Sequence, residues 1–201
     1  MSNTPINNTG VIILSAGISR RMHSPKQFLK FDKERTFLEK IIDEYNTFGC
    51  CEIVLVTNSE IDWKNNLSYK PSDKVTTVIN NHLEHERYYS IKLGLSKISK
   101  SEFCFIQNID NPFVTPNLLE TLFQNRNKEG YVSPRYKGKG GHPILLGENI
   151  INDIKSVKEK DLNFRTILNN YKCLKVDTEN PEILVNINTN EDYQKYFNIR
   201  G

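Results

Sequence analysis

Residues 11–26 have the sequence V-I-I-L-S-A-G-I-S-R-R-M-H-S-P-K, and this stretch decides which fold we expect. Its apolar beginning, Val11–Ser15, is typical of a buried parallel strand. The small residues 15–17 allow the backbone to approach a phosphate and to donate its N–H groups there. Three basic side chains follow that can neutralise a polyphosphate, namely Arg20, Arg21 and Lys26. The alternative interpretation is a strand-to-helix turn with solvated basic residues.

Outside this stretch, short apolar segments alternate with amphipathic ones along the chain. Further strands are predicted at residues 52–57, 75–79, 102–107, 131–133, 143–146, 174–176 and 184–187. Helices are predicted at residues 37–48, 88–98, 116–127, 148–155, 162–169 and 191–196. This alternation indicates a three-layer, Rossmann-like α/β fold with a mostly parallel sheet, helices on both faces and one domain over residues 1–201. Ligands bind such sheets at the carboxyl ends of strands, so the loops after the first and fourth strands are the candidate sites.

Composition and missing motifs exclude several classes of protein. The net charge of +3, from 27 basic and 24 acidic residues, is too small to indicate nucleic-acid binding. Short apolar runs and a polar beginning without a signal-peptide pattern predict a cytoplasmic protein with no membrane contact. Four cysteines, without CxxC spacing or a histidine at ligand spacing, predict neither a structural zinc site nor a disulfide framework. The chain has no GxxxxGK[ST] and no GxGxxG, which argues against P-loop enzymes and dinucleotide-dependent oxidoreductases.

The end of the predicted fourth strand carries one acid, Asp110, in the sequence F-I-Q-N-I-D-N-P of residues 105–112. A carboxylate at this place suits Mg²⁺, which takes few protein ligands and completes its shell with phosphate and water. The alternative is an aspartate that caps the helix beginning near Pro116. Asp110 lies far upstream for a cap, so we favour the metal ligand.

Residues 14–26 resemble the signature L-A-A-G-x-S-x-R-M-G-x-P-K of the MobA-like nucleotidyltransferases. This family includes the molybdopterin cytidylyl- and guanylyltransferases and, more distantly, the methylerythritol-phosphate cytidylyltransferases. The matching residues are Leu14, Ala16, Gly17, Ser19, Arg21, Met22, Pro25 and Lys26. Ser15 and His23 depart from the signature. The resemblance implies that Gly17, Arg21 and Lys26 hold a triphosphate, with Lys26 at the α-phosphate, and that the backbone of residues 14–17 binds the nucleotide.

The resemblance also bears on the acid. Asp110-Asn111-Pro112 is similar to the Asp-x-Pro of the molybdopterin-type enzymes, whereas the methylerythritol-phosphate enzymes carry their acid where this chain has Asn108. Gln27 and residues 113–116 are similar to that second group, which therefore stays an alternative.

Residues 80–95 resemble the family segment that lines the base pocket. Asn80, Ser90, Gly94 and Leu95 match it, which implies that Asn80 and Ser90 bind the nucleotide, while Glu86 replaces a usual glycine. Without the family, Ser90 is an ordinary helix residue.

Three more segments have candidate roles. Gly140-Gly141-His142-Pro143 is similar to the Gly-His-Pro of the molybdopterin cytidylyltransferase-like branch. The glycines beside Lys137 and Lys139 suggest a loop that closes on an anionic acceptor, bound by Lys139, His142 and Arg165. The alternative role for His142 is to fix a turn, and the alternative for Arg165 is an ordinary surface arginine. Residues 186–192 resemble a closing Asp-x-Asp-Thr-Pro-Glu-Asp motif, in which one acid supplies the second metal ligand. Asn186 and Asn188 stand in place of the two acids, and their amide oxygens are the candidate second ligands of Mg²⁺ beside Asp110.

The resemblance extends from about Val11 to Tyr196 and implies an Mg²⁺-dependent transfer of a nucleoside monophosphate, with release of pyrophosphate. CTP is the first expectation for the nucleotide, with GTP next, and a molybdopterin-like or other small phosphorylated acceptor is expected. Asp110, Arg21 and Lys26 are the predicted catalytic residues, in a monomer or homodimer. The alternatives are a methylerythritol-phosphate or sugar-phosphate nucleotidyltransferase and a non-catalytic nucleotide-binding protein of the same fold.

Overall fold

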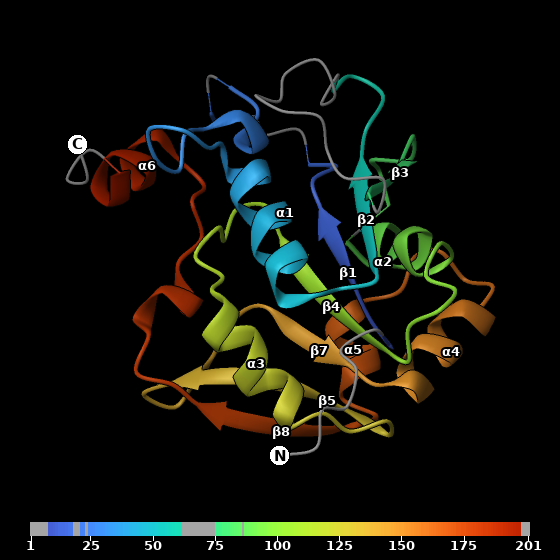
Figure 1. The fold of residues 1–201 in the computed structure, drawn as a ribbon. Helices are drawn as coiled ribbons and strands as arrows, with labels where there is room; N and C mark the ends of the chain where they lie inside the picture. Colours follow the sequence, from blue (N-terminus) through green and yellow to red (C-terminus); the bar gives the residue numbers. More distant parts are fainter. Residues whose placement is uncertain (1–7, 18–20, 23, 62–74, 86, 198–201) are drawn as a thin grey trace.

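Eight strands form a single mixed sheet in the computed structural model, which describes residues 8–17, 21–22, 24–61, 75–85 and 87–197. The strands are β1 (Thr9–Leu14), β2 (Glu52–Thr57), β3 (Val75–Ile79), β4 (Phe103–Asn108), β5 (Gly130–Tyr136), β6 (Lys139–Gly140), β7 (Ile144–Leu146) and β8 (Lys172–Asp177). Their order is β3-β2-β1-β4-β7-β5-β6, and β8 pairs with β5. The first four strands in this order run parallel, and the short β7 pairs antiparallel with both β4 and β5. The carboxyl ends of β1 and β4 therefore meet at the same edge (Figure 1).

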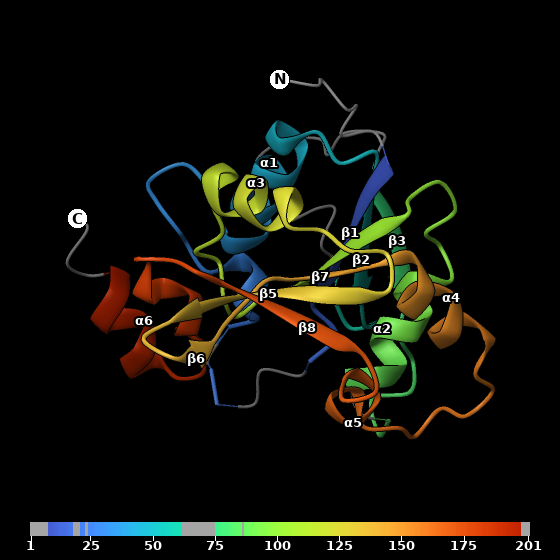
Figure 2. The ribbon, with the colours of Figure 1, turned by 90° about the horizontal axis from the view of Figure 1, so that it is seen from below.

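Helices cover both faces of the sheet, as predicted. They are α1 (Phe37–Phe48), α2 (Arg87–Leu95), α3 (Pro116–Gln124), α4 (Glu148–Ser156), α5 (Phe164–Leu168) and α6 (Asn190–Phe197). Figure 2 shows α1 and α3 on one face and α2, α4 and α5 on the other. The residues of β1 alternate between two buried clusters, with Ile13 facing α1 and Ile12 facing α2. In the described part of the chain, no helix is long and apolar enough to cross a bilayer.

Close contact between α2 and β1 depends on a glycine. A Cβ at Gly94 would lie 2.6 Å from Cγ2 of Ile12, closer than packed carbon atoms approach. The missing side chain lets α2 lie directly on the central strand. The beginning of α2 is thereby held beside the end of β1, where the first loop starts.

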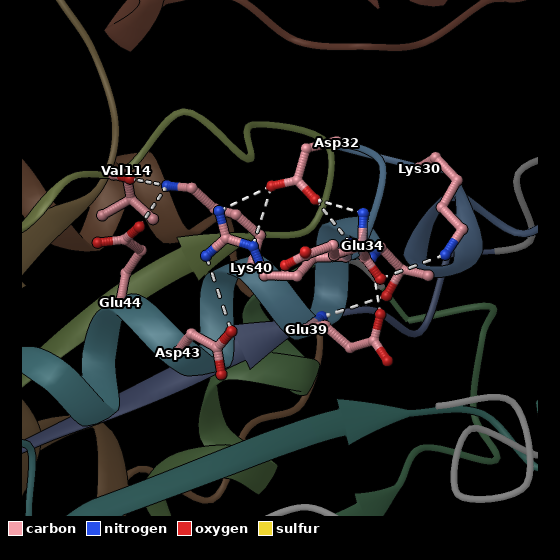
Figure 3. Close-up of polar contacts among 10 residues, drawn as sticks. Lys30, Asp32, Glu34, Glu39, Lys40, Asp43, Glu44 and Val114 are labelled. Atoms are coloured by element: carbon pink, nitrogen blue, oxygen red, sulfur yellow. Dashed lines mark hydrogen bonds and ion pairs between the residues drawn. The ribbon is translucent and has the colours of Figure 1, made fainter. Parts of the chain in front are cut away.

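The beginning of α1 is built from local polar contacts (Figure 3). The Thr36 side chain accepts a bond from the Glu39 N–H, and the Glu39 carboxylate accepts one from the Thr36 N–H, which together form a capping box. One turn on, the buried ammonium of Lys40 donates to the Val114 carbonyl and lies 3.3 Å from the Glu44 carboxylate. The helix ends at Gly49, whose φ of 96° is readily adopted by glycine. The predicted helix at residues 37–48 is confirmed.

The prediction of a strand at residues 184–187 is wrong. Residues Pro181–Leu184 form a 3-10 helix instead, which begins at Asn180 with a bond from the Glu182 N–H to the Asn180 side chain. The apolar pattern arises because Ile183 and Ile187 are buried in the core without belonging to a strand. Apolar runs this short do not distinguish a strand from a packed loop.

The glycine-rich stretch at residues 137–141, predicted as a loop, forms part of a β-hairpin. Arg135 pairs with Gly140 and Tyr136 with Lys139, so a two-residue turn joins β5 to β6. Both turn residues have positive φ, 46° at Lys137 and 82° at Gly138, as a tight hairpin requires. Gly141 then donates its N–H to the Pro134 carbonyl at 2.8 Å. The stretch is therefore a hydrogen-bonded hairpin.

Candidate active site

The loop after β1 is held in place up to Gly17. The Ser15 N–H donates to the Val56 carbonyl at 2.8 Å, and the Asn58 side-chain amide donates to the Ala16 carbonyl at 2.9 Å. Gly17 is exposed, and a Cβ there would meet nothing within 4 Å. Its backbone is therefore presented on a rigid support, while the N–H of Ser15 is already used by the sheet. Residues 18–20 and 23 of the predicted signature, among them Ser19, Arg20 and His23, lie outside the described residues.

Two adjoining cavities open at the carboxyl ends of β1 and β4. The larger cavity, about 650 Å³, is lined by Leu14, Ala16, Gly17, Arg21, Lys26, Asn80, Leu83, His85, Arg87, Ser90 and Asn188. The smaller cavity, about 390 Å³, is lined by Leu14, Gly17, Lys26, Arg87, Asn108, Ile109, Asp110, His142, Asn186 and Asn188. Leu14, Gly17, Lys26, Arg87 and Asn188 belong to both. These five residues form the boundary across which two bound molecules could meet.

Lys26 is the central cation of this boundary. It begins a short 3-10 helix, Lys26–Phe28, and its ammonium donates to Oδ1 of Asn188 at 2.7 Å. The same ammonium lies 3.7 Å from Oδ2 of Asp110. Burial lowers the pKa of Lys26 and the positive charge of Arg21 lowers it further, while Asp110 acts in the opposite direction. A cation with so little water around it interacts strongly with an incoming phosphate.

Asp110 is the acid of the smaller cavity and does not cap a helix, because Thr115 caps α3. Its Oδ1 is buried and has no hydrogen-bond partner among the described residues. Burial raises the pKa of Asp110, and the positive charges of Lys26 and Arg87 limit that rise. The Asp110 carbonyl accepts a bond from the Ile187 N–H at 2.7 Å, which brings residues 186–188 beside the carboxylate. The predicted oxygen ligands Asp110, Asn186 and Asn188 thus line one cavity, and they suit a hard divalent cation.

The two predicted base-pocket residues bond to each other. The buried side-chain amide of Asn80 donates to Oγ of Ser90 at 2.9 Å, and Oδ1 of Asn80 accepts from the His82 N–H at 2.8 Å. Asn80 therefore connects the end of β3 with α2 and with the segment between them. Glu86, which departs from the family pattern, lies outside the described residues.

His142, predicted to bind the acceptor, lines the smaller cavity. Burial, helped by the charge of Arg87, lowers the pKa of His142 to about 4, so its ring is neutral at pH 7. The buried Nδ1 has no hydrogen-bond partner in the described part of the structure. Of the other predicted site residues, Ser15, Lys139 and Arg165 do not line either cavity.

Comparison with known proteins shows which family the chain belongs to. The sequence profile of the MobA-like NTP transferase domain matches residues 11–175. The chain belongs to this family. It is 29% identical over 204 residues to a "probable molybdenum cofactor guanylyltransferase" of Natranaerobius thermophilus, with 94% of this chain and 95% of the relative covered. It is 28% identical over 133 residues to the 2-C-methyl-D-erythritol 4-phosphate cytidylyltransferase of Fusobacterium nucleatum, with 64% and 57% covered.

Solved structures agree with the fold of a MobA-like domain. A nucleotidyl transferase of Methanothermobacter has a TM-score of 0.78 at 18% identity, covering 96% of this chain and 98% of its own. A Mycobacterium tuberculosis H37Rv protein, solved as a complex with manganese, has a TM-score of 0.74 at 15% identity with the same coverage. The predicted family and the predicted nucleotidyltransferase fold are confirmed.

Arg87 is a residue of the MobA-like site that sequence reasoning missed. It lies at the beginning of α2, lines both cavities and contributes positive charge at Asp110 and His142. Its guanidinium also lies 5.8 Å from the centre of the Phe164 ring. The signal was available, because Arg87 falls inside the segment that resembles the base pocket and three residues before Ser90.

Asn111 was missed as a positioning residue of the same site. Its buried side-chain amide donates to the carbonyls of Glu182, Ile183 and Val185. Gln107, buried on β4, donates in turn to the Asn111 carbonyl at 2.7 Å. These bonds hold the segment that leads to Asn186 and Asn188 beside Asp110. No local pattern indicates this role, because donor and acceptors are about seventy residues apart.

Proposed function

We propose that the chain transfers a nucleoside monophosphate from a nucleoside triphosphate to a small phosphorylated or molybdopterin-like acceptor and releases pyrophosphate. The observation that carries this proposal is the convergence of Gly17, Lys26 and Asp110 on two adjoining cavities at the ends of β1 and β4. Membership of the MobA-like family supports the same reaction class. The larger cavity would take the nucleotide and the smaller one the acceptor.

In this reaction an oxygen of the acceptor attacks the α-phosphorus in line with the leaving group. A new P–O bond forms, the bond from the α-phosphorus to the oxygen that bridges to the β-phosphate breaks, and pyrophosphate leaves with the bonding electrons. Lys26, which borders both cavities, neutralises charge on the α-phosphate, and Arg21 in the larger cavity does so on the leaving phosphates. No side chain becomes a covalent nucleophile, since positioning and charge neutralisation supply the rate.

Mg²⁺ is the proposed cofactor. The Asp110 carboxylate would hold it, because one of its buried oxygens has no partner among the described groups. Asn188 already accepts a bond from Lys26, so Asn186 is the better second ligand of the two predicted amides. When bound, the cation supplies further neutralisation of phosphate charge. Two amide oxygens in place of acids predict a weaker metal affinity than a pair of carboxylates gives.

The base of the nucleotide is proposed to be cytosine or guanine. CTP was the first expectation from sequence, and the relative that matches over nearly the whole chain is named a guanylyltransferase. Asn80 and Ser90 line the larger cavity and bind each other, so the base meets a polar wall that is already ordered.

The test is pyrophosphate release with Mg²⁺, each of the four nucleoside triphosphates and a panel of acceptors that includes molybdopterin and methylerythritol phosphate. Asp110→Asn keeps the shape of the carboxylate and removes its charge, and we expect turnover to fall about 100-fold or more. Asp177→Asn is the matched control, since this exposed acid pairs with Arg135 and lines neither cavity.

Turnover that requires one nucleotide, one acceptor and Asp110 would establish the transferase and name its substrates. Tight nucleotide binding without turnover on any acceptor would favour a non-catalytic nucleotide-binding protein. Absence of nucleotide binding would contradict the proposal.

A further inference from the structure

A second group of metal-ligand side chains lies outside the proposed Mg²⁺ site, in the segment between β3 and α2. One ligand atom from each of His82, Glu84 and His85 can be chosen so that all three lie within 4.8 Å of one another. Oε1 of Glu84 is shared, at 3.0 Å from Nδ1 of His82 and 4.0 Å from Nε2 of His85. In the part of the chain that the structure describes, this is the one such group of three His, Cys, Asp or Glu residues.

His85 has the environment of a metal-binding histidine. Its Nδ1 contacts the Asp161 carboxylate, which comes from the segment before α5. A carboxylate on one ring nitrogen fixes the tautomer, orients the ring and makes the other nitrogen a better ligand. That other nitrogen, Nε2, is the atom that faces Glu84. Asp161 therefore occupies the position that an outer-sphere acid has in histidine–metal sites.

The cluster is also positioned before any ion binds. The His82 N–H donates to the buried Asn80 side chain, and the rings of both histidines pack against Tyr89 with centroids 5.7 and 4.9 Å away. Tyr89 is buried on α2. The side chain of His82 is half-exposed, so an ion from solvent can reach the cluster.

We propose that His82, Glu84 and His85 bind one transition-metal ion, with Zn²⁺ as the preferred ion and Asp161 as the outer-sphere partner of His85. Two imidazoles and one carboxylate form a donor set that zinc accepts, with a fourth position open to water. Tetrahedral Zn²⁺ with Zn–N bonds of about 2.0–2.1 Å requires ligand atoms about 3.3 Å apart, so side-chain rotations of the three residues suffice. The imidazoles favour Zn²⁺, Ni²⁺ or Cu²⁺ over Mg²⁺, which separates this site chemically from Asp110.

The proposed Zn²⁺ site lies at the wall of the larger cavity, so a bound ion would affect that cavity. His85 lines that cavity, and Asp161 belongs to a segment 76 residues away in the sequence. A bound ion would hold residues 82–85 together, strengthen the hydrogen bond between His85 and Asp161, and so reduce motion of this cavity wall. The inference needs no catalytic turnover and does not depend on the proposed function.

The experiment measures metal binding to the full chain after chelator treatment, without nucleotide. Zn²⁺ is titrated in competition with a chromophoric chelator, and Co²⁺ binding is followed by its visible absorption. We expect one equivalent of Zn²⁺ and cobalt bands of tetrahedral intensity. His82→Ala and His85→Ala should each lower Zn²⁺ affinity at least about 100-fold, and Asp161→Asn should lower it by about 10–100-fold.

Two control variants separate this site from the rest of the molecule. His142→Ala removes a histidine outside the cluster, and Asp110→Asn removes the acid of the proposed Mg²⁺ site; both should keep the Zn²⁺ affinity of the parent. Thermal unfolding gives a second readout, because Zn²⁺ should raise the Tm of the parent and of these controls but not of His82→Ala. Circular dichroism checks that each variant is folded. If His85→Ala does not fold, His82→Ala still tests the site, because the side chain of His82 is half-exposed.

Absence of a saturable one-to-one site in the parent would overturn the proposal. So would an affinity that is unchanged in both His82→Ala and His85→Ala. Neither result bears on pyrophosphate release, and loss of turnover in Asp110→Asn leaves the zinc measurement intact. The two proposals can therefore fail separately.

Discussion

His142 illustrates how a single buried side chain couples stability to pH. Burial lowers its pKa from about 6.5 to about 4, so between these values the unfolded chain binds a proton that the folded chain does not. Stability then rises with pH across this window and is lost on acidification from about pH 6.5 to pH 4. We expect this loss to be on the order of 3 kcal/mol.

Urea unfolding at several pH values checks this expectation, with His142→Gln as the comparison. The variant has no group that titrates at this position, so its stability should change less between pH 6.5 and pH 4. Equal pH dependence in the two proteins would mean that His142 is not the group responsible.

Asn111 offers a second prediction at the scale of one residue. Asn111→Ala leaves the carbonyls of residues 182–185 without their side-chain donor, and we expect the free energy of unfolding to fall by about 2–3 kcal/mol. Asn125→Ala is the matched control, because the exposed Asn125 amide bonds to one carbonyl on the surface of α3 and should matter by less than about 0.5 kcal/mol. Denaturant unfolding measures the stability of both variants. Equal losses of stability would contradict a stabilising role for the bonds from the Asn111 amide to residues 182–185.

At the scale of a single helix, the stability of α1 depends on its capping box. Thr36→Ala removes the oxygen that accepts from the Glu39 N–H, which should lower the free energy of unfolding by about 1 kcal/mol. Thr36→Ser keeps that oxygen and should recover most of the loss. If the serine variant is as unstable as the alanine variant, the methyl group of Thr36, rather than the cap, is what stabilises α1.

The β5–β6 hairpin allows a test of backbone conformation alone. A Cβ at Gly138 would touch nothing within 4 Å, so any cost of Gly138→Ala comes from its φ of 82° and should be about 1 kcal/mol. Gly140→Ala in the same hairpin has no positive φ and only an ordinary contact with Ser133, and its effect should be smaller. Thermal unfolding of both variants is the measurement. A neutral Gly138→Ala would mean that the turn is not the tight hairpin described above.

At the scale of the whole molecule, binding at the site should stabilise the fold. A ligand present at 100 times its Kd adds about 2.7 kcal/mol to the free energy of unfolding. We expect CTP or GTP with Mg²⁺ to raise the Tm of the parent more than the nucleotide does alone. In Asp110→Asn the additional effect of Mg²⁺ should disappear, while Asp177→Asn should behave like the parent. An Mg²⁺ effect that persists in Asp110→Asn would place the cation elsewhere.

The family, the alternation of strands and helices, and several candidate residues could be predicted from sequence because they depend on local chemistry. The apolar run from Val11 predicts a strand, which is β1, and the small residues 15–17 after it predict a loop that can approach a phosphate. Thr36 and Gly49 define the ends of α1 through bonds within one or two turns of helix. Errors occurred where a pattern had two solutions, as at residues 184–187, where Ile187 is buried and Leu184 and Val185 are partly buried without forming a strand.

Only the tertiary structure decided which of these residues meet. Lys26 bonds to Asn188 across 162 residues, and Asp161 contacts His85 across 76, because sheet order and helix packing bring those segments together. The same packing brings Arg87 to both cavities and leaves Ser15, Lys139 and Arg165 outside them. The sequence alone determines the local conformations and the side chains available, since these follow from short-range sterics and hydrogen bonds. Distances between remote side chains follow from how the buried faces pack, which no local pattern contains.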